Sequence, residues 1–488
     1  MALMTVTIRG AGLVLAGIVC ATGVAVLPEL GLKVMVGLAA IAGAVALAVG
    51  LGRPREVLLA AYIAALSYNR QYFSFDAILG DSGTQGLYWI VADPVLAMLL
   101  LSSLVARDQT AGDHAPLGTI LLPILPFLFV CCVSSLLADR PDWAANDTYR
   151  VIKFAILLAW LHWNMNRSLW LTAIVTLAVI GLLQSLLGLT QVLLKGEASL
   201  LAMAGLATQT GGIETEIENR ARGTLGHPNM FAPYLLMLVP AAFGMALFTR
   251  QRLLCLVGLG LTVIGLVGVF VSKSRAPIAL LGLALVLVAI TAVYLRALSM
   301  RVFLGSALVL TAIGALAILP LLQQIVERIE GDLVSSVTFR TDFNTAATLI
   351  WNDHPIWGIG PNNLNLELRR HFPLLADLVR DTEQFRDVGN VRSPTVHNVY
   401  FLMLAETGLV GLAAFLFLAA CSLTRAIGAA ARTEDAVRGL CIGIGIGLFA
   451  QFLQQMVDFS LWYDVCWFTF AILLAIVGTA PRHAPHIR

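Results

Sequence analysis

The sequence contains few charged residues and no long run of lysine or arginine. Charged residues make up 12% of the 488 residues, and the formal net charge is +2. A nucleic-acid ligand requires a basic surface, so this class of partner is not expected. The seven cysteines include no CxxC pair and no metal-ligand spacing, and we interpret them as small apolar core residues. The chain also shows no internal repeat and no low-complexity segment.

Apolar residues are what the sequence has in excess. They make up 59% of the chain, and the mean hydropathy is +0.86. A helix needs about 20 apolar residues to cross a bilayer, and windows of that length predict about 12–14 transmembrane helices. We therefore predict an all-α polytopic membrane protein with one large loop outside the membrane. The first apolar stretch is similar to a signal peptide, but the hydrophobic pattern continues past it, so we interpret it as the first span.

The apolar pattern divides the chain into four regions. One long polar segment separates the predicted spans, and within it the stretch LELRRHFPLLADLV carries Leu368, Phe372, Leu375 and Val379 at helical spacing, which predicts a short amphipathic helix. The predicted regions are N-terminal transmembrane helices at 1–194, central transmembrane helices with arginine-bearing outer loops at 195–322, the large loop at 323–396, and C-terminal transmembrane helices at 397–488.

The distribution of basic residues predicts the orientation. Short cytoplasmic connections are enriched in lysine and arginine, and this rule places both termini inside and the large loop outside. Two outer connections oppose the bias because each carries a pair of cations, Arg220 with Arg222 and Lys273 with Arg275. These cations either belong to a binding site or interact with lipid headgroups, as arginines at helix ends commonly do.

Each cation pair precedes a predicted helix start. RARGTLGHPNMF (220–231) and SKSRAPIAL (272–280) lead through Pro228 and Pro277 into inward-going spans, and proline is common in the first helical turn. A helix N-terminus carries free N–H groups and a partial positive charge, so Arg222 and Arg275 would complete anion sites suited to phosphate oxygens. His397 opens a third inward-going span, and an imidazole suits the removal of a proton from a hydroxyl. We predict that the three helix starts meet at the outer surface.

The helix after His397 differs from a plain membrane anchor. At about 100° per residue, Gly408 and Gly411 fall on the face of His397 and Glu406 lies opposite. Glycines on that face would open a groove for a neighbouring helix or an acyl chain. The alternative is that His397 only caps the helix and the glycines only serve packing. Asp93, in the apolar span IVADPVLAM, is either a site residue or half of a structural pair with an arginine.

The stretch HNVYFLMLAETGLVG resembles the signature of the O-antigen ligase and Wzy-type polymerase superfamily, which is His-Asn, nine residues, then Gly-x-x-Gly. Here the pattern is formed by His397, Asn398, Gly408 and Gly411. RGTLGHPNMFAPYLL, SKSRAPIALL and FRTDFNTAATLIWNDHPIWGIGPNNL are similar to the family's other blocks, in the usual order. The resemblance covers about residues 215–425, and the preceding part of the chain matches only in hydropathy.

The resemblance implies a glycosyltransferase of the GT-C type. Such an enzyme works at the periplasmic face of the bacterial inner membrane on a glycan attached to undecaprenyl pyrophosphate. The resemblance implies neither a metal nor a cofactor, and the sequence contains no Asp-x-Asp and no histidine cluster with ligand spacing. By resemblance, Arg222 and Arg275 would bind the pyrophosphate leaving group, and His397 would be the general base of an inverting transfer to an acceptor hydroxyl.

Five further residues receive supporting roles. Arg340, in SVTFRTDF, is a weaker match to the family and is expected to bind phosphate or sugar. Asn229 and Asn398 are expected to be supporting hydrogen-bond donors. Arg220 and Lys273 join the candidate pyrophosphate-binding residues because they stand beside Arg222 and Arg275.

Three functions stay open at this point. The first is a polymerase that joins lipid-linked repeat units of an O-antigen or exopolysaccharide. The second is a ligase that transfers the glycan to lipid A–core, and the third is a non-catalytic transporter of lipid-linked glycans, which would not need a base at His397. Because lipid A–core is rich in phosphate, it favours a basic receiving surface, but the 323–396 loop carries seven basic and ten acidic residues. This balance favours the polymerase.

Overall fold

The computed structural model describes residues 52–68, 71–73, 88–105, 120–194, 220–305, 340–371 and 396–483. The predicted spans before residue 52, including the first apolar stretch, and the last predicted span of the central region lie outside the described residues. Residues 340–353 are helical. The other described elements are α3 (Pro54–Leu66), β1 (Gln71–Phe73), β2 (Tyr88–Ile90), α4 (Ala92–Val105), α6 (Leu125–Leu137), α7 (Pro141–Asn164), α8 (Arg167–Leu193), α11 (Pro228–Phe248), α12 (Arg252–Val271), α13 (Arg275–Tyr294), α16 (Leu364–His371), α18 (Val399–Ala431), α19 (Asp435–Gln454), η5 (Ser460–Trp462) and α20 (Asp464–His483).

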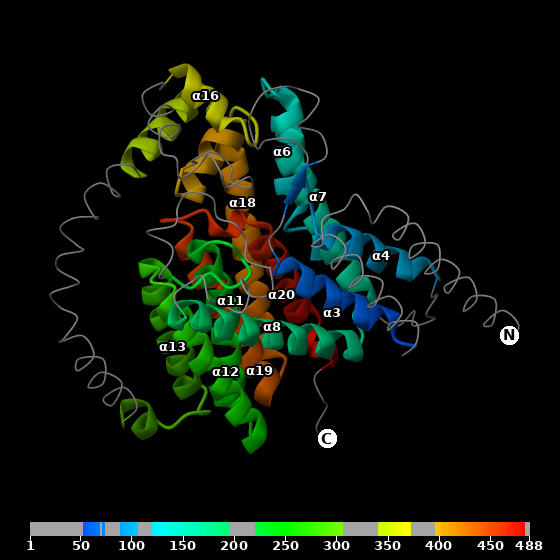
Figure 1. Ribbon diagram of the computed structural model, residues 1–488, viewed down its shortest axis with the longest axis vertical. Coiled ribbons are helices and arrows are strands. Elements are labelled where there is room, and N and C mark those ends of the chain that lie inside the picture. Colours follow the sequence, from blue (N-terminus) through cyan, green and yellow to red (C-terminus); the bar gives the residue numbers. More distant parts are fainter. Residues whose placement is uncertain are drawn as a thin grey trace, which may run out of the picture.

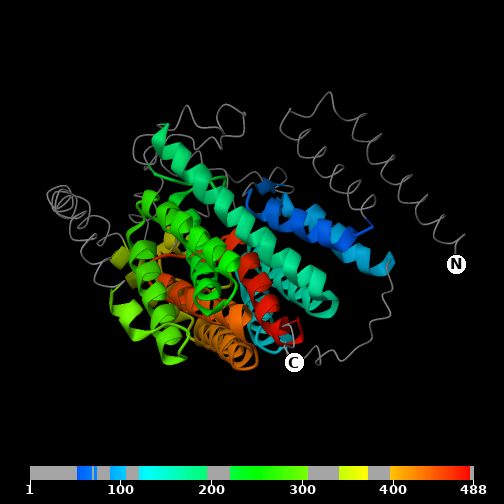
Figure 2. The same cartoon turned by 90° about the horizontal axis from the view of Figure 1, so that it is seen from below.

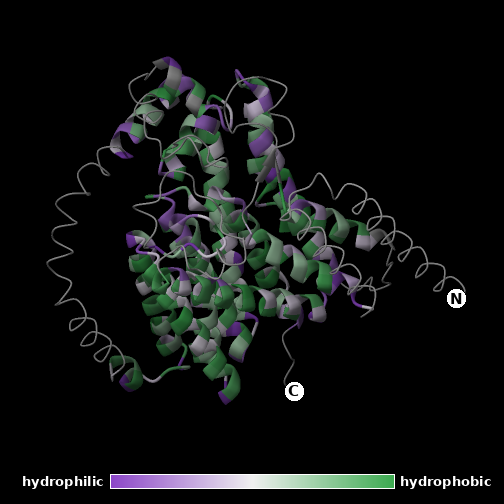
Figure 3. Cartoon of the chain, viewed as in Figure 1, coloured by the Kyte–Doolittle hydropathy of each residue, from purple (hydrophilic) through white to green (hydrophobic). Residues whose placement is uncertain are grey.

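The described secondary structure is helical apart from one antiparallel pair of short strands, β1 and β2. Seven of the described helices are long and apolar enough to cross a membrane, namely α8, α11, α12, α13, α18, α19 and α20. The apolar helices Ala92–Ser103 and Leu125–Leu137 are shorter. Figure 3 shows that hydrophobic residues dominate α8 and α11 to α13, whereas hydrophilic residues gather around α16 and the start of α7. The predicted all-α polytopic membrane fold is confirmed, and the total of about 12–14 spans stays a prediction.

α11 lies at the centre of the bundle, where it packs against α8, α12, α13, α19 and α20. α19 approaches it closely, because Gly439 and Gly443 face the carbonyl oxygens of Gly244 and Pro240. A Cβ on either α19 glycine would lie 2.1 Å from the oxygen it faces, so small residues set this helix spacing. Figure 2 shows α8 between the N-terminal helices α3 and α4 and the helices α11 to α13.

The described part of the predicted large loop docks on the bundle at its 340–371 segment. Asn363 and Arg140 exchange two hydrogen bonds, from the Arg140 N–H to Asn363 Oδ1 (3.1 Å) and from Asn363 Nδ2 to the Arg140 carbonyl oxygen (3.2 Å). Asn362 donates to the carbonyl oxygen of Trp143 at 3.3 Å. These contacts fix the segment to the turn between α6 and α7, and Figure 1 shows α6 and α16 at the same end of the molecule. α16 includes Leu368 of the predicted amphipathic helix, whereas Phe372, Leu375 and Val379 lie outside the described residues.

α18 is broken near its start, at Gly408, where φ is 68° and ψ is −170°. The backbone of residues 355–360 fills the break. The Ile359 N–H donates to the carbonyl oxygen of Ala405 (3.0 Å), and the Gly360 N–H donates to that of Glu406 (2.8 Å). The inserted backbone therefore satisfies carbonyl groups that a continuous helix would bond internally.

The break corrects the prediction made for the helix after His397. Because the chain leaves the helical conformation at Gly408, a constant angle per residue does not relate His397 to Gly408 and Gly411. The predicted groove at Gly408 is filled, since a Cβ there would lie 2.1 Å from the carbonyl oxygen of Ile356. The close approach expected of glycine is real at Gly408, but the partner is the 355–360 backbone rather than a neighbouring helix or an acyl chain.

Candidate active site

The two arginine-bearing connections lie side by side. The Ala221 N–H donates to the carbonyl oxygen of Val271 at 3.0 Å. Arg220 then joins the two segments through its side chain, with Nε donating to the Ser272 carbonyl oxygen (2.9 Å) and Nη2 to Ser274 Oγ (3.1 Å). Arg220 Nη2 also donates to Asn229 Oδ1 at 3.3 Å. The starts of α11 and α13 are thus held together, and Arg220 and Asn229 both take part in the link.

The loop that carries Arg222 is fixed from α8. Gln191 Oε1 accepts from the backbone N–H groups of Arg222 (3.1 Å) and Gly223 (2.9 Å), and Gln191 Nε2 donates to the Gly223 carbonyl oxygen (2.9 Å). Two helical turns earlier on α8, Gln184 Oε1 accepts from the Thr224 N–H at 2.9 Å. Sequence reasoning missed these glutamines, although two of them seven residues apart on an apolar helix are a usable signal because they lie on one face.

His227 lies where the predicted groups meet. It caps α11, and its Nδ1 accepts from the Asn229 N–H at 3.1 Å. Burial, followed by the charges of Arg220, His397 and Arg222, lowers the pKa of His227 to about 3. Because those charges act on one imidazole, the structure brings both arginines and His397 to the start of α11. No role was predicted for His227 from the sequence, although it lies within the stretch RGTLGHPNMFAPYLL.

His397 lies two residues before the start of α18 and is half-buried. Its ring packs edge-on against Phe459, with 5.3 Å between ring centroids and an interplanar angle of 86°. Asn398 caps α18, since its Oδ1 accepts from the Tyr400 N–H at 3.0 Å, and its Nδ2 donates to the Met456 carbonyl oxygen at 2.9 Å. The predicted hydrogen-bond donor Asn398 therefore contacts backbone, and it fixes His397 against the connection between α19 and α20.

Two exposed cations stand at the start of α13. Arg275 is its first residue, and Lys273 precedes it in a left-handed conformation with φ of 55°. Pro228 and Pro277 lie in the first turns of α11 and α13, as predicted. The start of α13 therefore carries two positive charges in addition to the partial positive charge of its N-terminus.

Arg340 lies near the connection between α19 and α20. Its charge lowers the pKa of Asp458, but burial has the larger effect and raises that pKa to about 6. The Phe459 N–H donates to Asp458 Oδ1 at 2.8 Å. Phe459 packs on His397, so Arg340 is linked to His397 through the adjacent residues Asp458 and Phe459.

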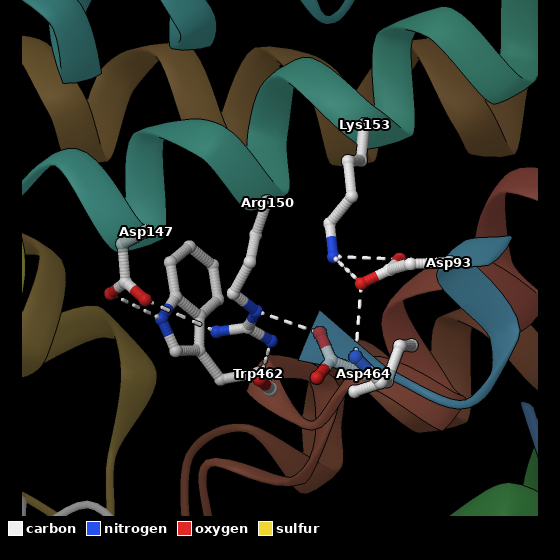
Figure 4. Close-up of polar contacts among 7 residues, drawn as sticks. Asp93, Asp147, Arg150, Lys153, Trp462 and Asp464 are labelled. Atoms are coloured by element: carbon white, nitrogen blue, oxygen red, sulfur yellow. Dashed lines mark hydrogen bonds and ion pairs between the residues drawn. The ribbon is translucent and has the colours of Figure 1, made fainter. Parts of the chain in front are cut away.

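Asp93 belongs to a structural pair. Both of its carboxylate oxygens accept from Lys153 Nζ, at 3.0 and 3.1 Å, and the Ile90 N–H donates to Oδ2 at 3.0 Å. Of the two roles considered for Asp93, the structure therefore favours the structural ion pair (Figure 4). The predicted partner was wrong, because it is Lys153 on α7 and not an arginine.

A second buried ion pair, on the same face of α7, holds the start of α20. Arg150 donates to Asp464 (2.9 Å), to Asp147 (3.3 Å) and to the carbonyl oxygen of Trp462. Trp462 in turn donates from Nε1 to Asp147 at 3.1 Å (Figure 4). Hydrogen-bonded ion pairs of this kind are costly to break in an apolar surrounding. They therefore fix η5, which directly follows Phe459.

The fold and the site define a polytopic membrane protein with cationic helix starts gathered around a histidine. The O-antigen ligase family model matches residues 260–416, a segment that includes Arg275, Arg340 and His397 but begins after Arg222. The match supports membership of the O-antigen ligase/Wzy-type family, in agreement with the resemblance seen in the sequence. No curated protein matches the chain. The family indicates a glycosyltransferase-like enzyme in a membrane, with a lipid-linked glycan and an acceptor as its partners.

Proposed function

We propose that the protein transfers a glycan from undecaprenyl pyrophosphate to an acceptor hydroxyl at the periplasmic face of the bacterial inner membrane. The observation that carries this proposal is the gathering of Arg220, Arg222 and His397 around His227 at the start of α11. A lipid-linked donor presents its pyrophosphate at the membrane surface, and cations beside helix N-termini are suited to bind it. Two arginines offer the bidentate geometry that phosphate oxygens prefer.

The arginines have distinct structural settings, which fit distinct roles. Arg220 is engaged in hydrogen bonds that join α11 to α13, so we assign it a positioning role. Arg222 stands on a loop fixed by Gln191, and Arg275 begins α13. We propose that Arg222 and Arg275 hold the pyrophosphate, and that Lys273 and Arg340 add positive charge to the surroundings of the donor.

The transfer we propose is a single inverting displacement that needs neither a metal nor a cofactor. The acceptor oxygen attacks the anomeric carbon as His397 removes the hydroxyl proton, so a new C–O bond forms. The bond between the anomeric carbon and the pyrophosphate oxygen breaks, and its electron pair leaves with undecaprenyl pyrophosphate. Arg222 and Arg275 stabilise the charge that develops on this leaving group. In the GT-C class such sites lie between the membrane and the aqueous phase, which fits the place of His397 two residues before the membrane helix α18.

Among the family's activities we favour the Wzy-type polymerase. The 323–396 loop carries more acidic than basic residues, ten against seven, and such a surface suits a glycan acceptor better than a phosphate-rich lipid A–core. The ligase that transfers glycan to lipid A–core is the second candidate. A transporter of lipid-linked glycans would use the cations but would gain nothing from a base.

A donor-only reaction separates these functions. Purified protein is incubated with undecaprenyl-pyrophosphate-linked repeat unit alone, and the products are resolved on a gel. A polymerase yields a ladder of longer lipid-linked glycans, because one donor serves as acceptor for another. Product that forms only after lipid A–core is added identifies a ligase, and an unchanged donor in both reactions refutes the enzymatic proposal.

A further inference from the structure

A second imidazole, that of His227, stands beside His397 in the candidate active site. Its Nδ1 accepts the backbone N–H of Asn229 at 3.1 Å as part of the N-cap of α11. A ring nitrogen that accepts a hydrogen bond carries no proton, so the neutral imidazole has its proton on Nε2. The cap therefore fixes the tautomer and leaves Nε2–H as the only donor of the ring.

The surroundings keep this imidazole neutral. Burial and the nearby charges of Arg220, His397 and Arg222 lower the pKa of His227 to about 3, far below any pH at which the protein works. In this state Nε2 has no lone pair for a substrate proton. His227 therefore has no part in the base role assigned to His397 and acts only as a donor.

The Nε2–H group is available to donate to a bound molecule. Within the described part of the chain no residue receives a hydrogen bond from this nitrogen. The charged side chains that act on His227 are Arg220, Arg222 and His397, which are all basic, so an anionic acceptor is favoured over a neutral sugar hydroxyl. The start of α11 adds its partial positive charge to the same place.

We propose that His227 donates its Nε2–H to an oxygen of the pyrophosphate in the lipid-linked donor. This inference rests on the proposed function and adds a neutral donor to the two arginines. A neutral donor binds the leaving group without adding to the repulsion among the cations. Its hydrogen bond strengthens as negative charge grows on the oxygen, so it serves both binding and transfer.

Two substitutions separate the two nitrogens of the ring. His227→Asn places an amide oxygen where Nδ1 stands, so it preserves the cap and removes the distal donor. His227→Gln places an amide N–H near the position of Nε2 and removes the cap acceptor. Binding of glycan-free undecaprenyl pyrophosphate, thermal stability in detergent and donor-only turnover are measured for the wild type and both variants.

We expect His227→Asn to melt as the wild type does and to bind undecaprenyl pyrophosphate about ten- to a hundredfold more weakly, the range for loss of one hydrogen bond to a charged group. His227→Gln is expected to melt at a lower temperature and to bind more tightly than His227→Asn. Wild-type affinity in His227→Asn, or equal losses of affinity and stability in both variants, overturns the inference. A wild type that neither binds undecaprenyl pyrophosphate nor transfers glycan instead refutes the proposed function, and the role of His227 falls with it.

Discussion

Gly408→Ala tests whether the break in α18 organises the region below His397. Gly408 has φ of 68° and ψ of −170°, a conformation that is essentially restricted to glycine. The added Cβ would lie 2.1 Å from the carbonyl oxygen of Ile356 and 2.6 Å from the backbone nitrogen of Trp357. Both contacts are with backbone, so rotation of a side chain does not relieve them. The substitution must displace the 355–360 segment or refold the break.

The magnitude follows from strain and lost hydrogen bonds. Backbone strain at such a position costs about 1–3 kcal/mol. The bonds from Ile359 and Gly360 into the break, and from the Leu409 N–H to the Pro355 carbonyl oxygen (2.9 Å), depend on the same geometry, and each contributes about 0.5–1.5 kcal/mol. Together the loss is roughly 2.5–7.5 kcal/mol, a large part of the about 5–15 kcal/mol that stabilises a typical domain.

The assay is thermal unfolding of detergent-purified protein, followed by the loss of the monodisperse peak in size-exclusion chromatography. Gly428→Ala is the matched control, because Gly428 lies in the same helix with no atom within 4 Å of an added Cβ. Alanine is favoured there by about 1 kcal/mol of helix propensity. Equal melting temperatures for the two variants would show that the break does not hold the inserted segment.

Three further predictions concern charge, protonation and topology. Arg222→Ala and Arg275→Ala are each expected to abolish transfer in folded protein, and lysine to rescue poorly because it lacks the planar fork; near-normal turnover in both alanine variants would make them ordinary headgroup contacts. The pKa of Asp458 is raised to about 6, so the folded protein loses stability as the pH rises from about 4 to 6 and the carboxyl group ionises. Asp458→Asn should therefore raise the melting temperature at pH 7.5 but not at pH 4. An equal gain in melting temperature at both pH values would exclude this titration. In a cysteine-free background, an impermeant thiol reagent added to spheroplasts should label Asp353→Cys and not Glu434→Cys, and the reverse pattern would invert the proposed orientation.

Local sequence signals predicted the helix starts well. Pro228 and Pro277 fall in first turns because proline needs no N–H partner there. The cation pairs beside them lie close together because α11 and α13 are neighbours. For α18 the possible cap was expected at His397, whereas the structure places it one residue later, at Asn398. Such signals act over a few residues and do not depend on the tertiary structure.

Features that depend on contacts between distant segments of the chain could not be predicted from the sequence. The partner of Asp93 is Lys153, sixty residues later in the chain, and no local pattern connects them. The break at Gly408 exists because residues 355–360 are inserted there, whereas hydropathy alone describes an uninterrupted helix. His227 was missed because one histidine before a proline is a common cap, and only the surrounding charges distinguish it.

The most direct test of the central claim is the comparison of donor binding and turnover in His397→Ala. Removal of a general base lowers turnover by about 10²–10⁴-fold, while the affinity for the lipid-linked donor should hold because the arginines that bind pyrophosphate are intact. The two quantities are measured on the same preparation, with the donor-only reaction for turnover and equilibrium binding of undecaprenyl pyrophosphate for affinity. Wild-type turnover, or a loss of affinity as large as the loss of turnover, would contradict the assignment of His397 as the base.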